Sequence, residues 1–221
     1  MSRLKDLRAH LRAIRTLIRG VARGLPTLEA SGDPHELFGR WFADAAASGL
    51  LLPESLALAT ASADGRPSAR MVLLKGVGPD GFRFFTNYGS HKAAELDANP
   101  QAALCFHWSV LERQVRIEGR VERLSTEESA AYFATRGRGS QIGAWASDQS
   151  RPIPDRTKLQ AQVAEIEARF AGKDIPLPEF WGGYRLIPDR FEFWQGRANR
   201  LHDRLAYTPR DGGWEITRLQ P

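Results

Sequence analysis

The sequence is poor in cysteine and has no long apolar run. Cys105 is the only cysteine among 221 residues and falls in an apolar stretch that reads as a buried strand. No disulfide can therefore form within the chain, which suits a reducing compartment. No apolar stretch reaches the length of a membrane-spanning helix, and the N-terminus lacks the pattern of a secretory signal peptide. These features predict a cytoplasmic protein.

Two kinds of ligand-binding motif are also missing. The five histidines are scattered, and no group of histidine and cysteine has the spacing of metal ligands. We therefore expect no metal site built from protein side chains. Neither G-x-G-x-x-G nor a Walker loop occurs, which argues against a Rossmann domain or a P-loop.

Basic residues exceed acidic ones, but the excess is confined to one end of the chain. The formal net charge is +5, and residues 1–24 hold seven basic side chains and one acidic side chain. The rest of the chain holds 24 basic and 25 acidic residues. A nearly neutral body argues against nucleic-acid binding, because a basic surface supplies most of the affinity for phosphates.

In the basic segment, leucine, isoleucine and valine recur at steps of three and four residues between the arginines. This spacing predicts an amphipathic helix, which could lie on a membrane, act as a transit peptide, or dock on the protein or a partner subunit. We favour docking or a loosely ordered arm, because Asp6 and a single apolar seam are weak evidence for the other roles. Residues 1–32 are thus expected to form an arm and linker, and residues 33–221 a single domain.

The rest of the chain predicts a mainly β protein with flanking helices. Asp33 and Pro34 suit the start of a helix that runs to about Ser48. Strands at 55–61, 68–75 and 82–86 are joined by tight turns, which predicts an antiparallel meander. Further strands are expected at 102–108, 113–123, 183–187, 190–194, 201–207 and 214–219, with helices from 90, 125 and 155. The predicted architecture is an antiparallel barrel with helices around it.

Two short patterns indicate that an anion binds. Lys92 falls in the first turn of a helix, where the helix dipole disfavours a cation, unless a phosphate lies there. A tolerated surface lysine explains this pattern equally well. Tyr132 and Arg136 are four residues apart on a helix, and Ser140 follows four further on, placed by a loop if glycines 137 and 139 end that helix. Two hydroxyls and a guanidinium would grip a phosphate monoester.

The densest group of aromatic and basic residues spans positions 194–204. Read as an extended strand, this segment places Arg200, His202 and Arg204 on one face. An imidazole between two guanidiniums suits an anionic, partly aromatic ligand. A solvated edge strand would show the same alternation, but the nearby Trp194 and Gly196 favour the ligand.

Six groups of motifs occur in a fixed order along the chain. They are Arg70-Met71-Val72-Leu73-Leu74-Lys75, Phe85-Thr86-Asn87, Leu111-Glu112-Arg113-Gln114-Val115, Ser140-Gln141-Ile142-Gly143-Ala144-Trp145, Pro176-Leu177-Pro178 with Phe180-Trp181-Gly182-Gly183, and Glu192-Phe193-Trp194-Gln195-Gly196 with Arg200-Leu201-His202-Asp203-Arg204. Together they resemble the motifs of the pyridoxine (pyridoxamine) 5′-phosphate oxidase family, over almost everything from Asp33 to Pro221. The resemblance implies a split-barrel flavoprotein, a homodimer with FMN in clefts at the subunit interface.

The resemblance also implies roles for individual residues. FMN binding would fall to Arg70, Met71, Val72, Leu73, Leu74, Lys75, Phe85, Thr86, His91, Lys92, Gln114, Gln149, Ser150, Trp194 and Arg204. Substrate binding would fall to Lys75, Tyr132, Arg136, Ser140, Arg200, Leu201 and His202, with Arg200 and His202 catalytic. The phosphate grip inferred from spacing thus coincides with the substrate-phosphate site of the family. Phe85 and His91 stand where many relatives have tyrosine and arginine, so we expect weaker FMN binding and unchanged chemistry.

The implied reaction oxidises pyridoxine 5′-phosphate or pyridoxamine 5′-phosphate to pyridoxal 5′-phosphate. Two electrons pass to FMN, and dioxygen reoxidises the flavin to give hydrogen peroxide. One alternative is a split-barrel FMN oxidase of another aromatic substrate, as in phenazine biosynthesis, but the phosphate grip argues against it. Another is a non-catalytic flavin- or haem-binding barrel, which would be expected to lose Arg200 and His202.

Overall fold

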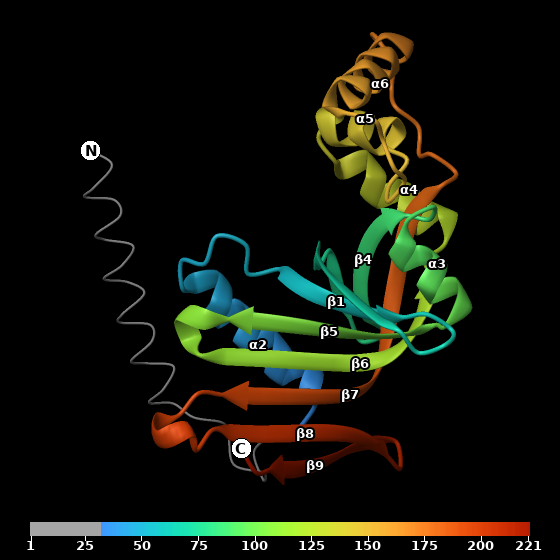
Figure 1. The fold of residues 1–221 in the computed structure, drawn as a ribbon. Coiled ribbons are helices and arrows are strands. Elements are labelled where there is room, and N and C mark those ends of the chain that lie inside the picture. The colour runs from blue at the N-terminus through green and yellow to red at the C-terminus, as the bar shows by residue number, and fades with distance from the viewer. Residues whose placement is uncertain (1–31) are drawn as a thin grey trace, which may run out of the picture.

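One curled antiparallel sheet dominates the computed structural model, which describes residues 32–221 (Figure 1). Its strands are β1 Ser55–Ala61, β2 Pro67–Leu73, β3 Gly76–Gly78, β4 Gly81–Asn87, β5 Gln101–Trp108, β6 Arg113–Arg123, β7 Trp181–Gln195, β8 Asp203–Arg210 and β9 Gly213–Leu219. The helices are α2 Pro34–Ala47, α3 His91–Ala98, α4 Thr126–Thr135, α5 Arg138–Ala146 and α6 Arg156–Arg169, with short 3-10 helices η2 Ser109–Leu111 and η3 Ala198–Arg200. The predicted mainly β class with flanking helices is confirmed.

The order of strands in the sheet corrects one prediction. The path runs β2-β1-β5-β6-β7-β4-β3, and β8 and β9 continue from β7. The β1–β2 hairpin was predicted, but the expected meander is wrong, because β4 pairs with β7 and not with β2. Tight turns reveal hairpins, whereas a pairing across about a hundred residues leaves no local signal. The sheet curls until β2 and β4 contact each other, so both strands border one space.

The longest strand, β7, is continuous where two separate strands were predicted. It passes through Pro188, and its pairing with β6 shifts between Glu118 and Gly119. A Cβ atom on Gly119 would lie 2.0 Å from the carbonyl oxygen of Ile187, so only glycine allows this approach. Figure 1 shows the strand turning along its length. Its first half pairs with β4 and its second half with β8, while β6 runs along both.

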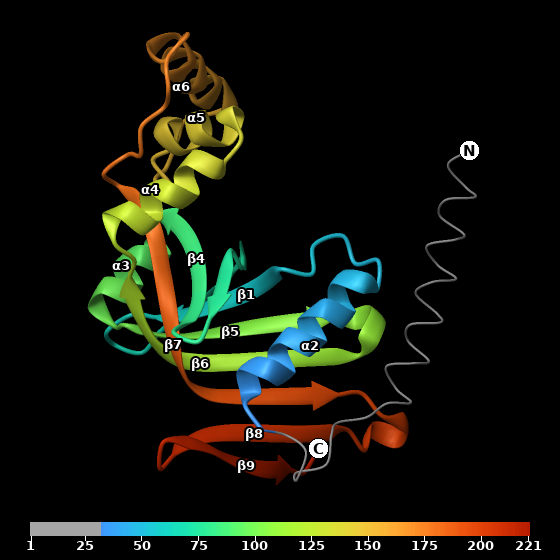
Figure 2. The same ribbon diagram turned by 180° about the vertical axis from the view of Figure 1, so that it is seen from behind.

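The main core lies between the sheet and α2, which crosses the back of the sheet (Figure 2). The side chain of Asp33 accepts a hydrogen bond from the backbone N–H of His35, and Pro34 occupies the first turn, as predicted. From α2, Phe38 packs edge-on against Phe82 and Phe106. Aromatic burial of this kind fixes the helix on the sheet.

Helices α4, α5 and α6 form a projection beyond one end of the sheet (Figure 1). The predicted capping box at the start of α4 is present, since Ser125 and Glu128 each accept a hydrogen bond from the other's backbone N–H. The predicted loop around Ser140 is wrong, because α5 begins at Arg138 and continues through Gly139. Ser140 therefore lies in the first turn of a helix. The break between α4 and α5 is only two residues long, Arg136 and Gly137.

The remaining predictions concern the two ends of the chain. The amphipathic helix and most of the linker fall on residues 1–31, outside the described residues. At the other end, β8 begins at Asp203 and not at Leu201, because η3 and an irregular turn precede it. Between residues 32 and 221, no helix is long and apolar enough to cross a bilayer.

Replacing Gly119 by alanine should destabilise the protein, because the new methyl group would meet the backbone of Ile187 and Pro188, which cannot move aside as a side chain would. We expect a loss of about 1–3 kcal/mol in the free energy of unfolding, measured in urea at a fixed protein concentration. Gly39→Ala is the control, since a Cβ atom there meets nothing within 4 Å. On the exposed face of α2, alanine stabilises a helix relative to glycine by up to ~1 kcal/mol. Equal stabilities of the two variants would contradict this account of the bulge.

Candidate functional site

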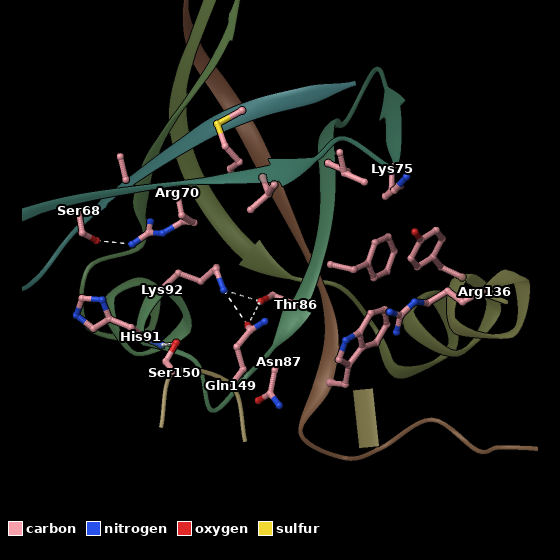
Figure 3. Close-up of a pocket in the computed structure, with 17 residues that line it drawn as sticks. Ser68, Arg70, Lys75, Thr86, Asn87, His91, Lys92, Arg136, Gln149 and Ser150 are labelled. Atoms are coloured by element: carbon pink, nitrogen blue, oxygen red, sulfur yellow. Dashed lines mark hydrogen bonds between the residues drawn. The ribbon is translucent and has the colours of Figure 1, made fainter. Parts of the chain in front are cut away.

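A cavity of about 690 Å³ opens where β2 and β4 approach each other (Figure 3). It is lined by residues 68–73 and Lys75 around β2, Phe85, Thr86 and Asn87 of β4, His91 and Lys92 of α3, Tyr132 of α4, Arg136 at the C-cap of α4, and Gln149, Ser150 and Trp181. Several of these lining residues have cationic side chains, and no lining residue is acidic. Such a cavity suits an anionic ligand.

Lys92 is the most informative of the cavity residues. Its side chain is buried, and its Nζ atom lies 3.0 Å from Thr86 Oγ1 and 2.9 Å from Gln149 Oε1 (Figure 3). Both partners are neutral, and no carboxylate pairs with Lys92 among the described residues. Burial, and next to it the positive charge of Arg70, lowers the pKa of Lys92 to about 8. A buried ammonium without a counterion is stabilised when an anion binds beside it.

The start of α3 supports the same interpretation. Ser90 stands at the N-cap position but makes no capping hydrogen bond, and its hydroxyl lies 3.3 Å from Lys92 Nζ. The backbone N–H of His91 donates to Ser150 Oγ, which joins the loop after α5 to this end of α3. The predicted position of Lys92 in the first turn is confirmed, and its burial excludes the alternative of a tolerated surface lysine.

Tyr132 and Arg136 face the cavity together, as their spacing predicts. The Tyr132 ring stacks on Phe85 with 3.9 Å between centroids, and the Arg136 guanidinium lies 4.6 Å from the centre of the Trp181 ring. The Nη1 atom of Arg136 is buried without a hydrogen-bond partner. Ser140 lines an adjoining space of about 280 Å³, whose lining also includes Arg136. A guanidinium with a free buried donor between two hollows is suited to grip an oxyanion.

Seven predicted site residues lie outside the main cavity besides Ser140. Leu74 is buried, and its backbone N–H donates to Glu54. The other six gather near the far end of β7: Gln114, Trp194, Arg200, Leu201, His202 and Arg204. The sheet register explains this second cluster, since Trp194 pairs with Gln114 on one side and Arg204 on the other. One chain therefore presents two separate groups of predicted site residues.

Within the second cluster, His202 and Arg204 are held by specific contacts. The imidazole of His202 lies 4.5 Å from the Trp194 ring, and its Nδ1 atom accepts a hydrogen bond from the backbone N–H of Arg197. When this ring is neutral, its proton is therefore on Nε2, which is available as a donor. Arg204 donates to the buried carboxylate of Glu192 and to the Gln220 carbonyl.

The predicted alternation of Arg200, His202 and Arg204 along one strand face is wrong. Asn199 and Arg200 have φ angles of 58° and 62° in η3, and β8 begins only at Asp203. A left-handed turn thus replaces the extended backbone that the alternation needs. Leu201 follows it and is 68% exposed.

Several residues of the cavity were missed by the sequence interpretation. Asn87 and Trp181 fall inside the motifs that carry the family resemblance, but no role was given to them. Ser68 shares a face of β2 with Arg70, a signal that alternation could have supplied. Glu95 contacts both from behind and lies one helical turn after His91 and Lys92, so helical spacing pointed to it.

The family models match two long segments of the chain. Residues 42–170 match the model described as pyridoxamine 5′-phosphate oxidase, and residues 181–221 match the pyridoxine 5′-phosphate oxidase C-terminal dimerisation region. The chain is 56% identical over 211 residues to the pyridoxine/pyridoxamine 5′-phosphate oxidase of Psychromonas ingrahamii, covering 96% of this chain and 97% of that one. It is 58% identical over 198 residues to the protein of the same name from Rubrobacter xylanophilus, covering 90% and 91%.

Solved structures show the same fold. PhzG from Burkholderia lata 383, in complex with tetrahydrophenazine-1-carboxylic acid, superposes with a TM-score of 0.83 at 34% identity, covering 89% of this chain and 98% of that one. A pyridoxamine 5′-phosphate oxidase-related, FMN-binding protein from Nostoc punctiforme superposes with a TM-score of 0.70 at 19% identity, covering 86% and 100%. The curled half-barrel sheet is therefore the split barrel that was predicted.

Proposed function

Because the chain belongs to the pyridoxine/pyridoxamine 5′-phosphate oxidase family, we propose that it is an FMN-dependent enzyme that oxidises pyridoxine 5′-phosphate and pyridoxamine 5′-phosphate to pyridoxal 5′-phosphate. The observation that carries this proposal is the cation-lined cavity, in which the buried Lys92 has no anionic partner among residues 32–221. Both the cofactor and the substrate of this reaction are phosphate monoesters. An acid-free cavity suits them, and it would be costly to maintain for a neutral ligand.

The residues around Lys92 fit the phosphate of FMN. Lys92, Arg70, Thr86, Gln149 and Ser150 supply donors from β2, β4, α3 and the loop after α5, and the donor set matches an oxyanion. Bound there, FMN would accept the two electrons of the oxidation at its isoalloxazine ring. Dioxygen is the proposed final electron acceptor, in keeping with an oxidase family, and is reduced to hydrogen peroxide. With pyridoxamine 5′-phosphate, the reaction also consumes water and releases ammonia.

The substrate phosphate would be held on the opposite side of the same cavity. Lys75, Tyr132 and Arg136 line this side, and Ser140 reaches it from the adjoining hollow. The free Nη1 donor of Arg136 supports this role. Holding the phosphate restricts where C4′ can lie in the cavity, so the carbon that is oxidised is oriented before reaction.

The second cluster would be supplied by another copy of the chain. Trp194, Arg200, His202 and Arg204 lie in residues 181–221, which match the dimerisation region of the family. We infer a homodimer in which FMN binds between subunits, with the cavity of one and the second cluster of the other. Arg200 and His202 would then approach the pyridine ring of the substrate. His202 Nε2–H would donate a hydrogen bond there, and Arg200 would stabilise negative charge.

The remaining expectations concern an alternative substrate, the location of the protein and its partners. An oxidase of an unphosphorylated aromatic substrate, such as the PhzG-like alternative, would leave the grip of Tyr132 and Arg136 without a purpose. A cytoplasmic location is in keeping with one half-buried cysteine, Cys105, whose thiol pKa is raised by burial. Dioxygen and B6 vitamers are the small-molecule partners that we expect, and no nucleic acid.

The purified protein should carry FMN, and its visible flavin absorbance should bleach when pyridoxine 5′-phosphate is added without oxygen. Unphosphorylated pyridoxine is the matched control and should reduce the flavin far more slowly, because it cannot use the grip of Lys75, Tyr132 and Arg136. Admitting oxygen should restore the absorbance. A protein that takes up no FMN, or that is reduced equally by both compounds, would refute the proposed substrate.

Affinity for FMN should fall as the pH rises above about 8. A bound phosphate raises the pKa of Lys92 from its value of about 8 in the free protein, so binding favours the protonated amine. The affinity for FMN therefore has its full value below pH 8 and decreases by roughly tenfold per pH unit above it. FMN titrations between pH 7 and 9.5 would measure this decrease in affinity, which reaches at most about 1.5 decades. In Lys92→Arg, whose charge is permanent, the decline should vanish; a decline that persists would assign it to another group.

Mixed dimers would test whether FMN binds between subunits. Lys92→Met and Arg204→Met should each weaken FMN binding, by roughly 10- to 100-fold for the loss of one charged hydrogen bond. In a dimer with one chain of each kind, purified through two different tags, one site would hold both changes and the other neither. That dimer should bind FMN tightly at half of its sites. If both residues served the same chain's site, the mixed dimer would bind no better than its parents.

A further inference from the structure

A single buried carboxylate lies directly behind the cation-rich wall of the cavity. Glu95 of α3 is 5% exposed and follows Lys92 by three residues. Its Oε2 atom lies 2.5 Å from Thr60 Oγ1 of β1, and its two oxygens lie 2.8 and 2.6 Å from Ser68 Oγ of β2. Glu95 does not line the cavity, but it ties α3 and β2, which do, to β1.

The main partner of Glu95 is Arg70. The Nη2 atom of Arg70 lies 3.1 Å from Glu95 Oε2 and also donates to Ser68, as Figure 3 shows. Its Nη1 atom donates to the Leu58 carbonyl at 3.2 Å and to Thr60 Oγ1. Both terminal nitrogens of the guanidinium are thus held from behind. An arginine that is already ordered loses less side-chain entropy when a ligand binds.

Charge gives Glu95 a second role. Arg70 and Lys92 repel each other, and Arg70 contributes to the lowered pKa of Lys92. Burial alone would raise the pKa of Glu95, but hydrogen bonds from Ser68, Thr60 and Arg70 outweigh it and hold this pKa below its usual value. The carboxylate is therefore ionised at neutral pH. His91 Nε2, on the exposed side of α3, lies 3.5 Å from Glu95 Oε1.

We propose that Glu95 is a positioning residue for the FMN phosphate: it fixes Arg70 of β2 and the N-terminal turn of α3, with Lys92, in one geometry. This inference rests on the proposed function, in which FMN binds in the cavity. Glu95 touches no ligand itself. It acts by holding the Arg70 guanidinium in place. Its effect is therefore confined to ligands that carry the phosphate.

The test compares FMN with riboflavin, which has the same ring system but no phosphate. Glu95→Gln keeps the shape of the side chain and removes its charge. We expect the Kd for FMN, measured by quenching of flavin fluorescence in the full chain freed of cofactor, to rise by roughly tenfold or more. The Kd for riboflavin should change by less than about twofold, since the phosphate contacts make no contribution to it. A general loss of structure would weaken both.

Asp97→Asn is the matched control. Asp97 lies on the same helix and also pairs with an arginine, Arg123, but this pair is at the surface and outside the cavity. The ratio of FMN to riboflavin affinity should stay at the wild-type value in this variant. Surface pairs of this kind contribute little to stability, so the fold is also expected to persist.

A second variant keeps the proposal testable if Glu95→Gln fails to fold. Thr60→Val is isosteric, lies outside the cavity lining, and removes a hydroxyl that contacts both Glu95 and Arg70. This variant should lower the ratio of FMN affinity to riboflavin affinity several-fold. An unchanged ratio in the folded variants would overturn the role of Glu95 while leaving the proposed function intact. Failure of the wild-type protein to bind FMN would instead remove the proposed function itself.

Discussion

The continuity of β7 is the constraint on which the arrangement of the site depends. Of its 15 residues, those from Tyr184 to Gln195 run along β6, those from Trp181 to Leu186 pair with β4, and those from Phe191 to Gln195 pair with β8. Trp181 at one end therefore lines the cavity, while Trp194 near the other end carries the second cluster. A continuous strand holds these two groups apart within one chain. In the proposed site, a second copy of the chain would supply the other half.

The cationic walls of both groups are supported by carboxylates that lie behind them. Glu95 holds Arg70 beside the cavity, and Glu192, which is 3% exposed, holds Arg204 and Arg116 near the other end of β7. In each case the acid is buried and accepts hydrogen bonds from the guanidinium. A buried charge must be paired, so these contacts are strong geometric restraints. The fold thus concentrates positive charge toward the ligand side without leaving the interior unbalanced.

Local features of the sequence predicted local structure well, and long-range pairing escaped it. The Asp33 cap, the Ser125 capping box and the β1–β2 hairpin are each encoded within a few residues. The pairing of β4 with β7 and the passage of β7 through Pro188 depend on partners distant in the sequence. In the site, spacing identified Lys92 and the pair Tyr132 and Arg136. The division of ligands between the two clusters came from family resemblance alone, since nothing in the spacing distinguishes one phosphate from another.

The turn before β8 explains why alternation failed at the segment where it looked most informative. Asn199 and Arg200 adopt left-handed backbone angles, which asparagine tolerates and arginine does not favour. Such a conformation costs on the order of 1 kcal/mol or more and persists only when its surroundings impose it. Here the Arg197–Asp203 ion pair and the hydrogen bond from Arg197 N–H to His202 close the turn at its base. The same contacts that break the strand pattern also fix the His202 ring, so the irregular backbone orients the two residues that the proposed mechanism uses.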